Sequence, residues 1–471
     1  MKKIRAAVAV VLCIIICLAA GCIIGEEQNS SDGGKTTETA QSNGDDTQST
    51  ESPAQNGGSD AIKIFLADAK ELQEPYGNPS VAMQAVAAGA NDFAFRLSAA
   101  LAESFEIELS TSAGNYNLVC SPYSVWIPLA ALVNATGEEY RDSLLEALSA
   151  SGVSAEDVNN AASRMLYNLT KQIDKDTEFF YDPLRIANAV FVDKDVTLKR
   201  DFARIFLDYY RGAVINVDFS SEQAVGAVNE WASKSTEGLI SEIVREFDPN
   251  TVAAIANAIY FSDRWQWEFD PQESAGDVFH SPTGDTEAVF MQREGDSQTY
   301  YEDDRVQAMP LRFMTGGGLY IILPKDGDAT GLLASMTGGY FDKIQTDSIS
   351  ASGKLLLPRF SFGSPVMSLA DTLAAMGVPL FDQATAPLTG GLIEENIPVW
   401  LSSAVHKAVI EVDEKGTTAA AVTVLAAAGA GPPEPTAPFE MICNSPFVFV
   451  LYSHTYDGGA QVLFTGIVNQ P

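Results

Sequence analysis

The residue types that most often perform chemistry are few in this chain of 471 residues and lie far apart. The three histidines, His280, His406 and His454, match no spacing with which proteins bind zinc, so we expect neither a metal site nor a cofactor. Among five cysteines, only Cys120 and Cys443 lie in the part that we expect to fold. Two cysteines make no disulfide framework, and their apolar neighbours favour buried thiols over a bridge.

The most unusual segment lies near the C-terminus and could act through its backbone rather than through reactive side chains. Residues 416–433 carry no charge, and ten of these eighteen residues are alanine or glycine. The flanking stretches "AVHKAVIEVDE" and "PFVFVLYS" are predicted strands, and a connection between two such elements usually has about four to six residues.

This segment is compatible with insertion into a sheet as a strand over residues 416–428. One face would carry Thr417, Ala419, Ala421, Thr423, Leu425 and Ala427, and the other would carry Thr418, Ala420, Val422, Val424, Ala426 and Ala428. No position is a charge, a proline or a large aromatic, each of which would oppose insertion between strands. An alanine-rich helix or a flexible linker is the alternative, since alanine favours helix.

The elements that would position this segment are a mixture of helices and strands. Residues 91–105 have helical spacing, and Ser121 before Pro122 is a helix cap followed by proline in the first turn. Short stretches rich in Ile, Val and Phe, such as "LRIANAVFV", "AAIANAIYF" and "GLYIILP", are predicted strands. Helices dominate the first third and strands the rest, which is typical of an α+β fold.

The N-terminus has the layout of a secretory signal peptide over residues 1–21. Lys2, Lys3 and Arg5 precede an apolar run that continues to Ala20. The run ends in "AAGC", which resembles the lipobox of prokaryotic lipoproteins and makes Cys22 the expected lipid anchor. We therefore expect an extracytoplasmic protein at the cell surface, anchored in the membrane by a lipid. A plain secretory signal or an uncleaved membrane anchor is the alternative.

Residues 22–77 are expected to form a tether and an N-terminal extension ahead of one folded domain over residues 78–471. From Ile24 to Gly58 the composition is polar and acidic, which cannot bury enough surface to fold, so we expect disorder there. The net charge of −33 argues against a nucleic-acid partner, because phosphate binding needs clustered Lys and Arg. It does not identify a partner, since acidic surfaces also serve solubility.

Several motifs occur in an order that resembles the serpin family along the whole predicted domain. They are "NLVCSPYSVWIPLA", "VNEWASKSTEGLI", "IANAIYFSDRWQWEFDP", "LPRF", "VHKAVIEVDEKGTTAAAVT", "PFVFV" and "LFTGIVNQP". The resemblance implies three β-sheets with about eight or nine helices and an exposed reactive-centre loop, and we expect a monomer. The uncharged segment falls where the family carries this loop. Its hinge would comprise Glu414, Gly416, Thr417, Ala419, Ala420 and Ala421.

The resemblance implies a suicide inhibitor of serine proteases and not an enzyme. In inhibitory serpins the target protease forms an acyl-enzyme with the loop, and the cleaved loop then inserts into the main sheet. The family's loop length places the scissile bond between Ala430 and Gly431, and any bond from Ala427 to Gly431 stays open. All candidate residues are small, so we expect an elastase-like or subtilisin-like target protease and exclude trypsin-like ones.

The resemblance also assigns residues that control the main sheet. Ser121, Ser124, Asn257 and His406 match a polar cluster beneath its central strands, and this cluster is no catalytic pair because no acid is indicated beside it. Trp265 matches a tryptophan near the loop's entry point. Glu414 is expected to pair with Arg293 at the base of the loop. The chain departs from the family at residues 134–135, where Asn-Ala replaces the usual Gly-Ala.

Two other classes of function remain open from the sequence. A non-inhibitory serpin-fold binding protein or chaperone on the cell surface would be cleaved without trapping the protease. A surface solute-binding lipoprotein, suggested by the anchor and tether alone, would keep its function when the loop is replaced. The natural target protease and its origin do not follow from the sequence.

Overall fold

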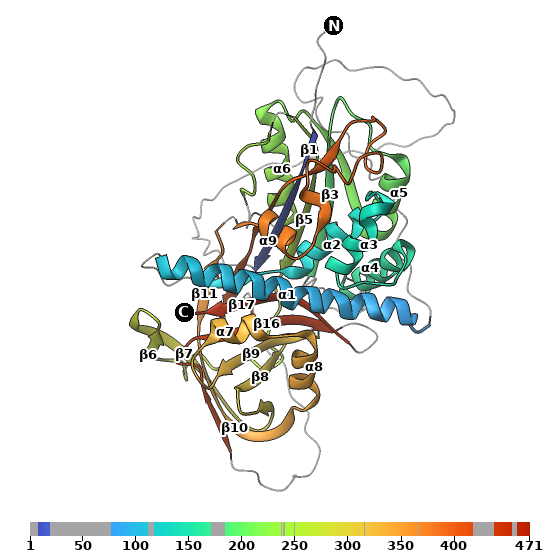
Figure 1. Ribbon diagram of the computed structural model, residues 1–471. Coiled ribbons are helices and arrows are strands. Elements are labelled where there is room, and N and C mark those ends of the chain that lie inside the picture. The colour runs from blue at the N-terminus through green and yellow to red at the C-terminus, as the bar shows by residue number, and fades with distance from the viewer. Residues whose placement is uncertain are drawn as a thin grey trace, which may run out of the picture.

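A computed structural model describes most of the predicted domain and a short N-terminal segment. The described residues are 8–18, 77–111, 117–170, 184–236, 238, 241–248, 250–314, 316–365, 367–417, 438–454 and 459–471. Figure 1 shows the long helix α1 lying across the middle of the molecule, between a central sheet on one side and a second sheet on the other.

The central sheet has six strands. Their order is β12 (Met367–Ser368), β13 (Val399–Lys407), β1 (Val8–Leu18), β5 (Thr251–Phe261), β3 (Leu184–Asp193) and β4 (Gly212–Val217). The apolar part of the predicted signal peptide thus forms β1, which runs parallel to both β5 and β13. Strand β3 is antiparallel to β5. The sheet therefore accommodates an eleven-residue strand between β5 and β13.

The second sheet has nine strands and bends at its longest one, β7 (Gly284–Glu302). One edge of β7 pairs with β10 (Ile349–Pro358), which is followed by β15 (Phe439–Ile442). The other edge pairs first with β6 (Ala275–Ser281) and then with β8 (Val306–Arg312), which is followed by β9 (Gly318–Pro324), β16 (Phe447–His454), β17 (Ala460–Val468) and β2 (Leu118–Cys120). A separate pair comprises β11 (Phe360–Gly363) and β14 (Val409–Val412). Because β7 serves both halves, this assembly corresponds to two of the three predicted sheets.

Nine α-helices and one short 3₁₀ helix surround these sheets in the described part of the chain. They are α1 (Val81–Thr111), α2 (Pro122–Leu132), α3 (Glu138–Ala147), α4 (Ala155–Thr170), α5 (Arg200–Tyr210), α6 (Glu222–Ser235), α7 (Ala329–Ser335), α8 (Gly338–Thr346), α9 (Ala370–Ala375) and η1 (Pro379–Phe381). Every residue of α2 is buried, with Pro122 in its first turn as predicted. No helix among the described residues is long and apolar enough to cross a membrane.

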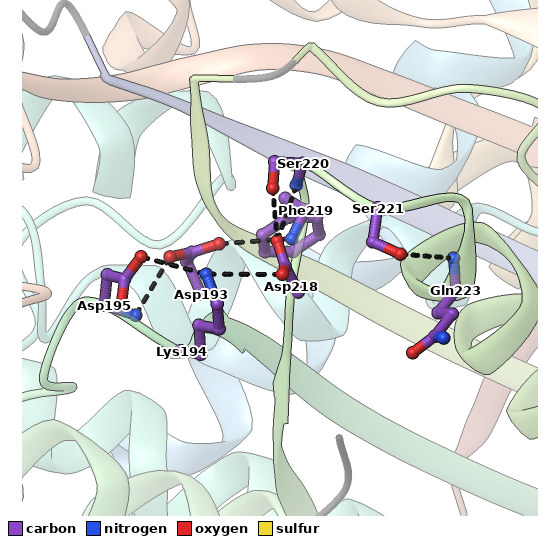
Figure 2. Close-up of polar contacts among 8 residues, drawn as sticks. All are labelled: Asp193, Lys194, Asp195, Asp218, Phe219, Ser220, Ser221 and Gln223. Atoms are coloured by element: carbon purple, nitrogen blue, oxygen red, sulfur yellow. Dashed lines mark hydrogen bonds and ion pairs between the residues drawn. The ribbon is translucent and has the colours of Figure 1, made fainter. Parts of the chain in front are cut away.

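Helix α6 packs on the outer face of the central sheet. The face of β5 beneath it carries Ala254, Ala256 and Ala258, which join an apolar cluster that also contains residues of β3, β4 and α6. Figure 2 shows how the helix is anchored at the ends of β3 and β4. The Asp193 carboxylate accepts from the backbone N of Phe219, and the Ser221 hydroxyl caps the helix by accepting from the N of Gln223.

The α+β class and the predicted architecture are confirmed by this structure and its sheets. Residues 91–105 are helical within α1, and the predicted strands around the loop are β13, β14 and β16. Cys120 and Cys443 are free, buried thiols, and burial raises the pKa of both. Residues 22–76, which include Cys22, lie outside the described residues.

Candidate functional site

The candidate site is the gap in the central sheet between β5 and β13, together with the hinge that enters it. Strand β1 fills this gap, and Ile14 of β1 is the register partner of both Asn257 on β5 and His406 on β13. After β13 the chain continues through β14 to residue 417, where the described part ends before the loop. The strand that leads to the loop is therefore also one wall of the gap.

The hinge begins with a tight turn that reverses the chain after β14. One Asp413 carboxylate oxygen accepts from the backbone N of Lys415 at 2.8 Å and of Gly416 at 3.1 Å. Gly416 has φ +156°, and a Cβ atom there would lie 2.2 Å from the backbone O of Asp263. A side chain cannot fit so close to another backbone, so the turn needs glycine at this position.

Beyond the turn, the hinge pairs antiparallel with the residues that follow β5. Gly416 lies opposite Arg264, and the backbone N of Thr417 donates to the backbone O of Asp263 at 2.9 Å. The Thr417 hydroxyl also accepts from the backbone N of Asp263 at 3.0 Å. Thr417 is fully buried. The last described residue of the hinge thus already extends the sheet beside β5 and is directed back along that strand.

The Glu414 side chain anchors the base of the hinge through Arg359, and the expected pairing with Arg293 is wrong. Arg359 Nε donates to Glu414 Oε1 at 2.7 Å, and the Ser274 hydroxyl donates to the same oxygen at 2.5 Å. Burial opposes ionisation of Glu414, but these two donors outweigh it and hold its pKa below the usual value. Arg293 instead donates to the backbone O of Trp267.

The register of the small β11–β14 pair explains this choice of partner. Phe360 lies opposite Val412, so the preceding Arg359 lies beside the turn that carries Glu414. The arginine belongs to the "LPRF" stretch, which the sequence analysis singled out only as a motif. The arginine of "LPRF" was therefore the sequence feature from which the Glu414–Arg359 pair could have been predicted.

Trp265 holds the turn from below, at the loop's entry point, where the sequence comparison had put it. Its side chain is 1% exposed, and its indole N–H donates to the backbone O of Asp413 at 2.8 Å. Its ring stacks on Phe313 with centroids 4.9 Å apart, and its backbone N donates to the O of Lys415. The tryptophan therefore ties the hinge to the rigid core as well as filling space.

The four polar residues predicted beneath the central strands are all buried, and two of them, Asn257 and His406, lie on the strands that border the gap. His406 Nε2 accepts from the backbone N of Ser121 at 3.2 Å, and burial lowers the His406 pKa to about 3, so the ring is neutral. Within the described part of the chain, four of their atoms have no hydrogen-bond partner: Ser121 Oγ, Ser124 Oγ, Asn257 Oδ1 and His406 Nδ1. The imidazole bonds a backbone amide and not a serine hydroxyl, which is no nucleophile–base arrangement.

Asn188 joins this cluster, although the sequence analysis did not select it. Its Oδ1 accepts from Asn257 Nδ2 at 2.7 Å, and the two residues lie directly opposite on β3 and β5. Both asparagines stand in the same tetrapeptide, "IANA", at 186–189 and 255–258. That repeat was an available signal. The remaining predicted site residues, Ala419, Ala420, Ala421, Ala430, Gly431 and Cys22, lie outside the described residues.

Comparison with known proteins shows which family this architecture resembles. The profile of the family described as serpin (serine protease inhibitor) matches residues 88–471. Mouse alpha-1-antitrypsin 1-4 is 29% identical over 417 residues, which cover 87% of this chain and 95% of the relative. An uncharacterized serpin-like protein of Thermococcus kodakarensis is 30% identical over 292 residues, which cover 61% of this chain and 66% of the relative.

Two solved structures share the fold. The thermophilic serpin tengpin in its native state superposes with a TM-score of 0.69 at 21% identity, covering 87% of this chain and 100% of that chain. Human thyroxine-binding globulin superposes with a TM-score of 0.68 at 23% identity, covering 83% of this chain and 100% of that chain. The fold is thus common to a thermophilic serpin and to a thyroxine-binding globulin, so the fold alone does not identify a function.

Proposed function

The chain belongs to the serpin family, and we propose that it is a suicide inhibitor of serine proteases whose cleaved loop inserts into the central sheet. The observation that carries this proposal is the hinge. Thr417 is already paired antiparallel with Asp263 at the mouth of a gap that can hold an eleven-residue strand. An inhibitor of this kind needs a loop that enters the sheet faster than the protease releases it.

The pairing of the hinge sets the register that a fully inserted loop would follow. Gly416 lies opposite Arg264 and Thr417 opposite Asp263, so each further step along the loop moves one residue back along β5. Continuing this register puts Thr423 opposite Asn257. The loop would run antiparallel to β5 and β13, and the absence of charge between residues 416 and 433 removes the main energetic cost of its burial.

The chemistry begins on the protease and needs no cofactor from the inhibitor. The protease's serine hydroxyl attacks the carbonyl carbon of Ala430, and its proton passes to the amine of Gly431 as the peptide bond breaks. An ester then joins Ala430 to the protease. Insertion pulls the ester away before water hydrolyses it. Small residues at the cleavage point fit elastase-like or subtilisin-like pockets, whereas a trypsin-like pocket needs Arg or Lys.

The predicted N-terminal processing fits this mechanism. Cleavage before Cys22 would remove Val8–Leu18 from the sheet and leave the gap between β5 and β13 open to the loop. A lipid on Cys22 and the polar stretch that follows would then hold the inhibitor at the cell surface as an extracytoplasmic, membrane-anchored lipoprotein. We propose that it acts there as a monomer.

The test is a mixture of the processed protein, obtained by expressing the full chain, with pancreatic elastase, subtilisin or trypsin, followed by a denaturing gel. We expect a band at the summed mass with elastase or subtilisin and none with trypsin. Protease treated beforehand with an active-site serine reagent is the control and should give no band. The peptide released from the C-terminal side identifies the bond that was cut.

The alternative is a serpin-fold binding protein or chaperone without inhibitory activity. Cleavage of the loop by all three proteases without any stable complex, and without a rise in the melting temperature after cleavage, would support this alternative. Such a result would mean that the loop is accessible to proteases but does not insert.

A further inference from the structure

Asp413 completes the turn at the base of the hinge with its side chain as well as with its backbone. It lies opposite Gly416 across the two-residue turn of Glu414 and Lys415, and its backbone N donates to the Gly416 O at 3.1 Å. In an ordinary hairpin the Gly416 N would donate back to the Asp413 O. Here the Asp413 carboxylate accepts this bond at 3.1 Å, together with one from the N of Lys415 at 2.8 Å. One side chain therefore binds both amides that close the turn.

The residues that follow β5 bind the carbonyl oxygens of the same turn. The Asp413 O accepts from the indole N–H of Trp265, and the Lys415 O accepts from the Trp265 backbone N. The Glu414 O accepts from the backbone N of Phe269 at 2.8 Å. These contacts satisfy acceptors only, so the amide donors of residues 415 and 416 depend on the Asp413 carboxylate. Without that carboxylate, both donors would lose the bonds that hold the turn closed.

The turn also sets the register that an inserted loop would follow along β13. Because Asp413 lies opposite Gly416, Thr423 would lie opposite His406, each seven residues further from the turn. The pairing of the hinge with β5 leads to the same position, since it puts Thr423 opposite Asn257. Asn257 and His406 do lie at the same level of the gap. Both walls therefore call for one register, and it is the register of a two-residue turn.

A looser turn would place the wrong side chains on the core side of the inserted strand. In the register set by the turn, Ala421 would lie opposite Ile259 of β5, which belongs to the main apolar core. If the turn took one more residue, Val422 would stand there instead, and every other side chain of the strand would change faces. A larger side chain in a space fitted to alanine is destabilising. Correct insertion therefore depends on keeping the turn at two residues.

We propose that Asp413 is a positioning residue for insertion, whose carboxylate keeps the turn of the inserted strand already formed in the intact inhibitor. The inference rests on the proposed function, because the turn matters in this way only if the loop inserts. Ordering a turn costs conformational entropy, and here that cost does not fall in the interval before water hydrolyses the acyl-enzyme. Asp413 therefore acts on the partition of the acyl-enzyme between trapping and release, and not on the attack of the protease on the loop.

The test compares Asp413→Ala with Asp413→Asn and with Asp326→Ala, each as the processed protein obtained by expressing the full chain. Asparagine keeps an oxygen acceptor in the same place, whereas alanine has none. Asp326 makes the same kind of bond, to the N of Asp328 at 3.0 Å, in the exposed turn between β9 and α7. Its removal is therefore the matched control for losing a carboxylate that holds a turn.

Each variant is mixed with pancreatic elastase or subtilisin, and a denaturing gel gives the ratio of cleaved, free inhibitor to complex. The loss of intact inhibitor gives the rate of loop cleavage. We expect Asp413→Ala to raise the ratio about tenfold at an unchanged rate of cleavage, which corresponds to about one hydrogen bond lost from the insertion step. Asp413→Asn keeps a weaker, uncharged acceptor and should raise the ratio less than about threefold. Asp326→Ala should behave as the wild type.

A wild type that forms the complex, with an unchanged ratio in Asp413→Ala, overturns the inference alone. The same holds if Asp413→Asn is as poor as alanine, or if loop cleavage itself becomes slower. Should the alanine variant not fold, Asp413→Ser replaces it, and its weaker turn-forming hydroxyl should raise the ratio about threefold. A wild type that forms no complex, and whose melting temperature does not rise after cleavage of the loop, refutes the proposed function and the inference with it.

Discussion

The hinge and the polar cluster border the same gap in the central sheet, yet they treat their buried polar groups in opposite ways. At the hinge, the buried Thr417 and Glu414 and the half-buried Asp413 form hydrogen bonds to the end of β5, to Arg359 and within the turn, respectively. In the cluster, four buried side-chain atoms lack a partner among the described residues. The polar groups of the hinge thus have hydrogen-bond partners in this structure, whereas four polar atoms of the cluster do not.

This difference indicates which of the two regions rearranges. A buried polar atom without a partner costs about 1–3 kcal/mol, so the cluster is poorly stabilised while β1 separates its two halves. In the inserted state that we propose, β1 has left the gap and Thr423 lies opposite Asn257, so both halves of the cluster gain new neighbours. The hinge needs no such change, because Thr417 already has the pairing that an inserted strand continues.

The largest effect is expected from breaking the satisfied region with Thr417→Arg. Thr417 is fully buried, and an arginine there would have to bury a guanidinium and its long side chain in the sheet, at a cost of several kcal/mol. Insertion should then be slower than release of the protease, and the stable complex on a denaturing gel should fall by about two orders of magnitude. Thr417→Ser, which keeps the hydroxyl, is the control and should retain the complex. A full yield of complex with Thr417→Arg would show that Thr417 stays outside the sheet.

Gly416→Ala should destabilise the hinge through the backbone alone. The new Cβ would lie 2.2 Å from the O of Asp263, which forces the two backbones apart and lowers the free energy of unfolding by about 2–3 kcal/mol. Gly226 of α6 is the matched control, since its Cβ would meet nothing within 4 Å. Gly226→Ala should raise stability by about 0.5–1 kcal/mol. Equal melting temperatures for the two variants would contradict the close approach at the hinge.

The polar cluster should make the stability of the protein depend on pH, through His406. His406 has its pKa lowered to about 3 by burial, from an ordinary value of 6.5, so the unfolded chain binds the extra proton between these pH values. The contribution of the neutral, buried His406 ring to the free energy of unfolding is therefore fully present above pH 6.5. It is lost as the pH falls, by about 1.4 kcal/mol per pH unit. Chemical denaturation at several pH values should show a shallower slope for His406→Gln. His280→Gln, at an exposed hairpin, controls for loss of an imidazole. A wild-type slope in His406→Gln would contradict the burial of a neutral ring.

How much of the fold follows from sequence can be judged from the strands. β16, read from "PFVFV", is buried over almost its whole length and could be predicted from its apolar run. The sharing of β7 between two halves of a sheet could not be predicted, because the burial pattern along its 19 residues is irregular and does not mark where the partners change. Partner choice depends on register between distant strands, which local pattern does not contain.

The candidate site shows the same limit. Ser121 and His406 lie 285 positions apart, and only the tertiary fold brings the residue before α2 to β13. Their resemblance to known motifs named both, but it assigned Arg293 to Glu414, whereas the partner is Arg359. That choice depends on Phe360 lying opposite Val412, a single step of strand register. The hydrogen bond from Asn188 Nδ2 to the backbone O of Tyr210 was missed because no side-chain motif records a backbone oxygen.

The smallest expected effect is on Ser124 of the polar cluster, and comparing it with Ser98 measures how well the cluster is hydrogen-bonded. Ser124 and Ser98 are both buried helical serines, but Ser98 Oγ has hydrogen bonds of 2.6 Å to Ala94 and Thr465, whereas Ser124 Oγ has none among the described residues. Removing a bonded hydroxyl leaves a buried partner unsatisfied, so Ser98→Ala should cost about 1–3 kcal/mol. Ser124→Ala removes an atom that is already unsatisfied, so it breaks no hydrogen bond and should leave stability unchanged or raise it. A loss at Ser124 as large as that at Ser98, measured by chemical denaturation, would mean that the cluster is as well bonded as the rest of the core.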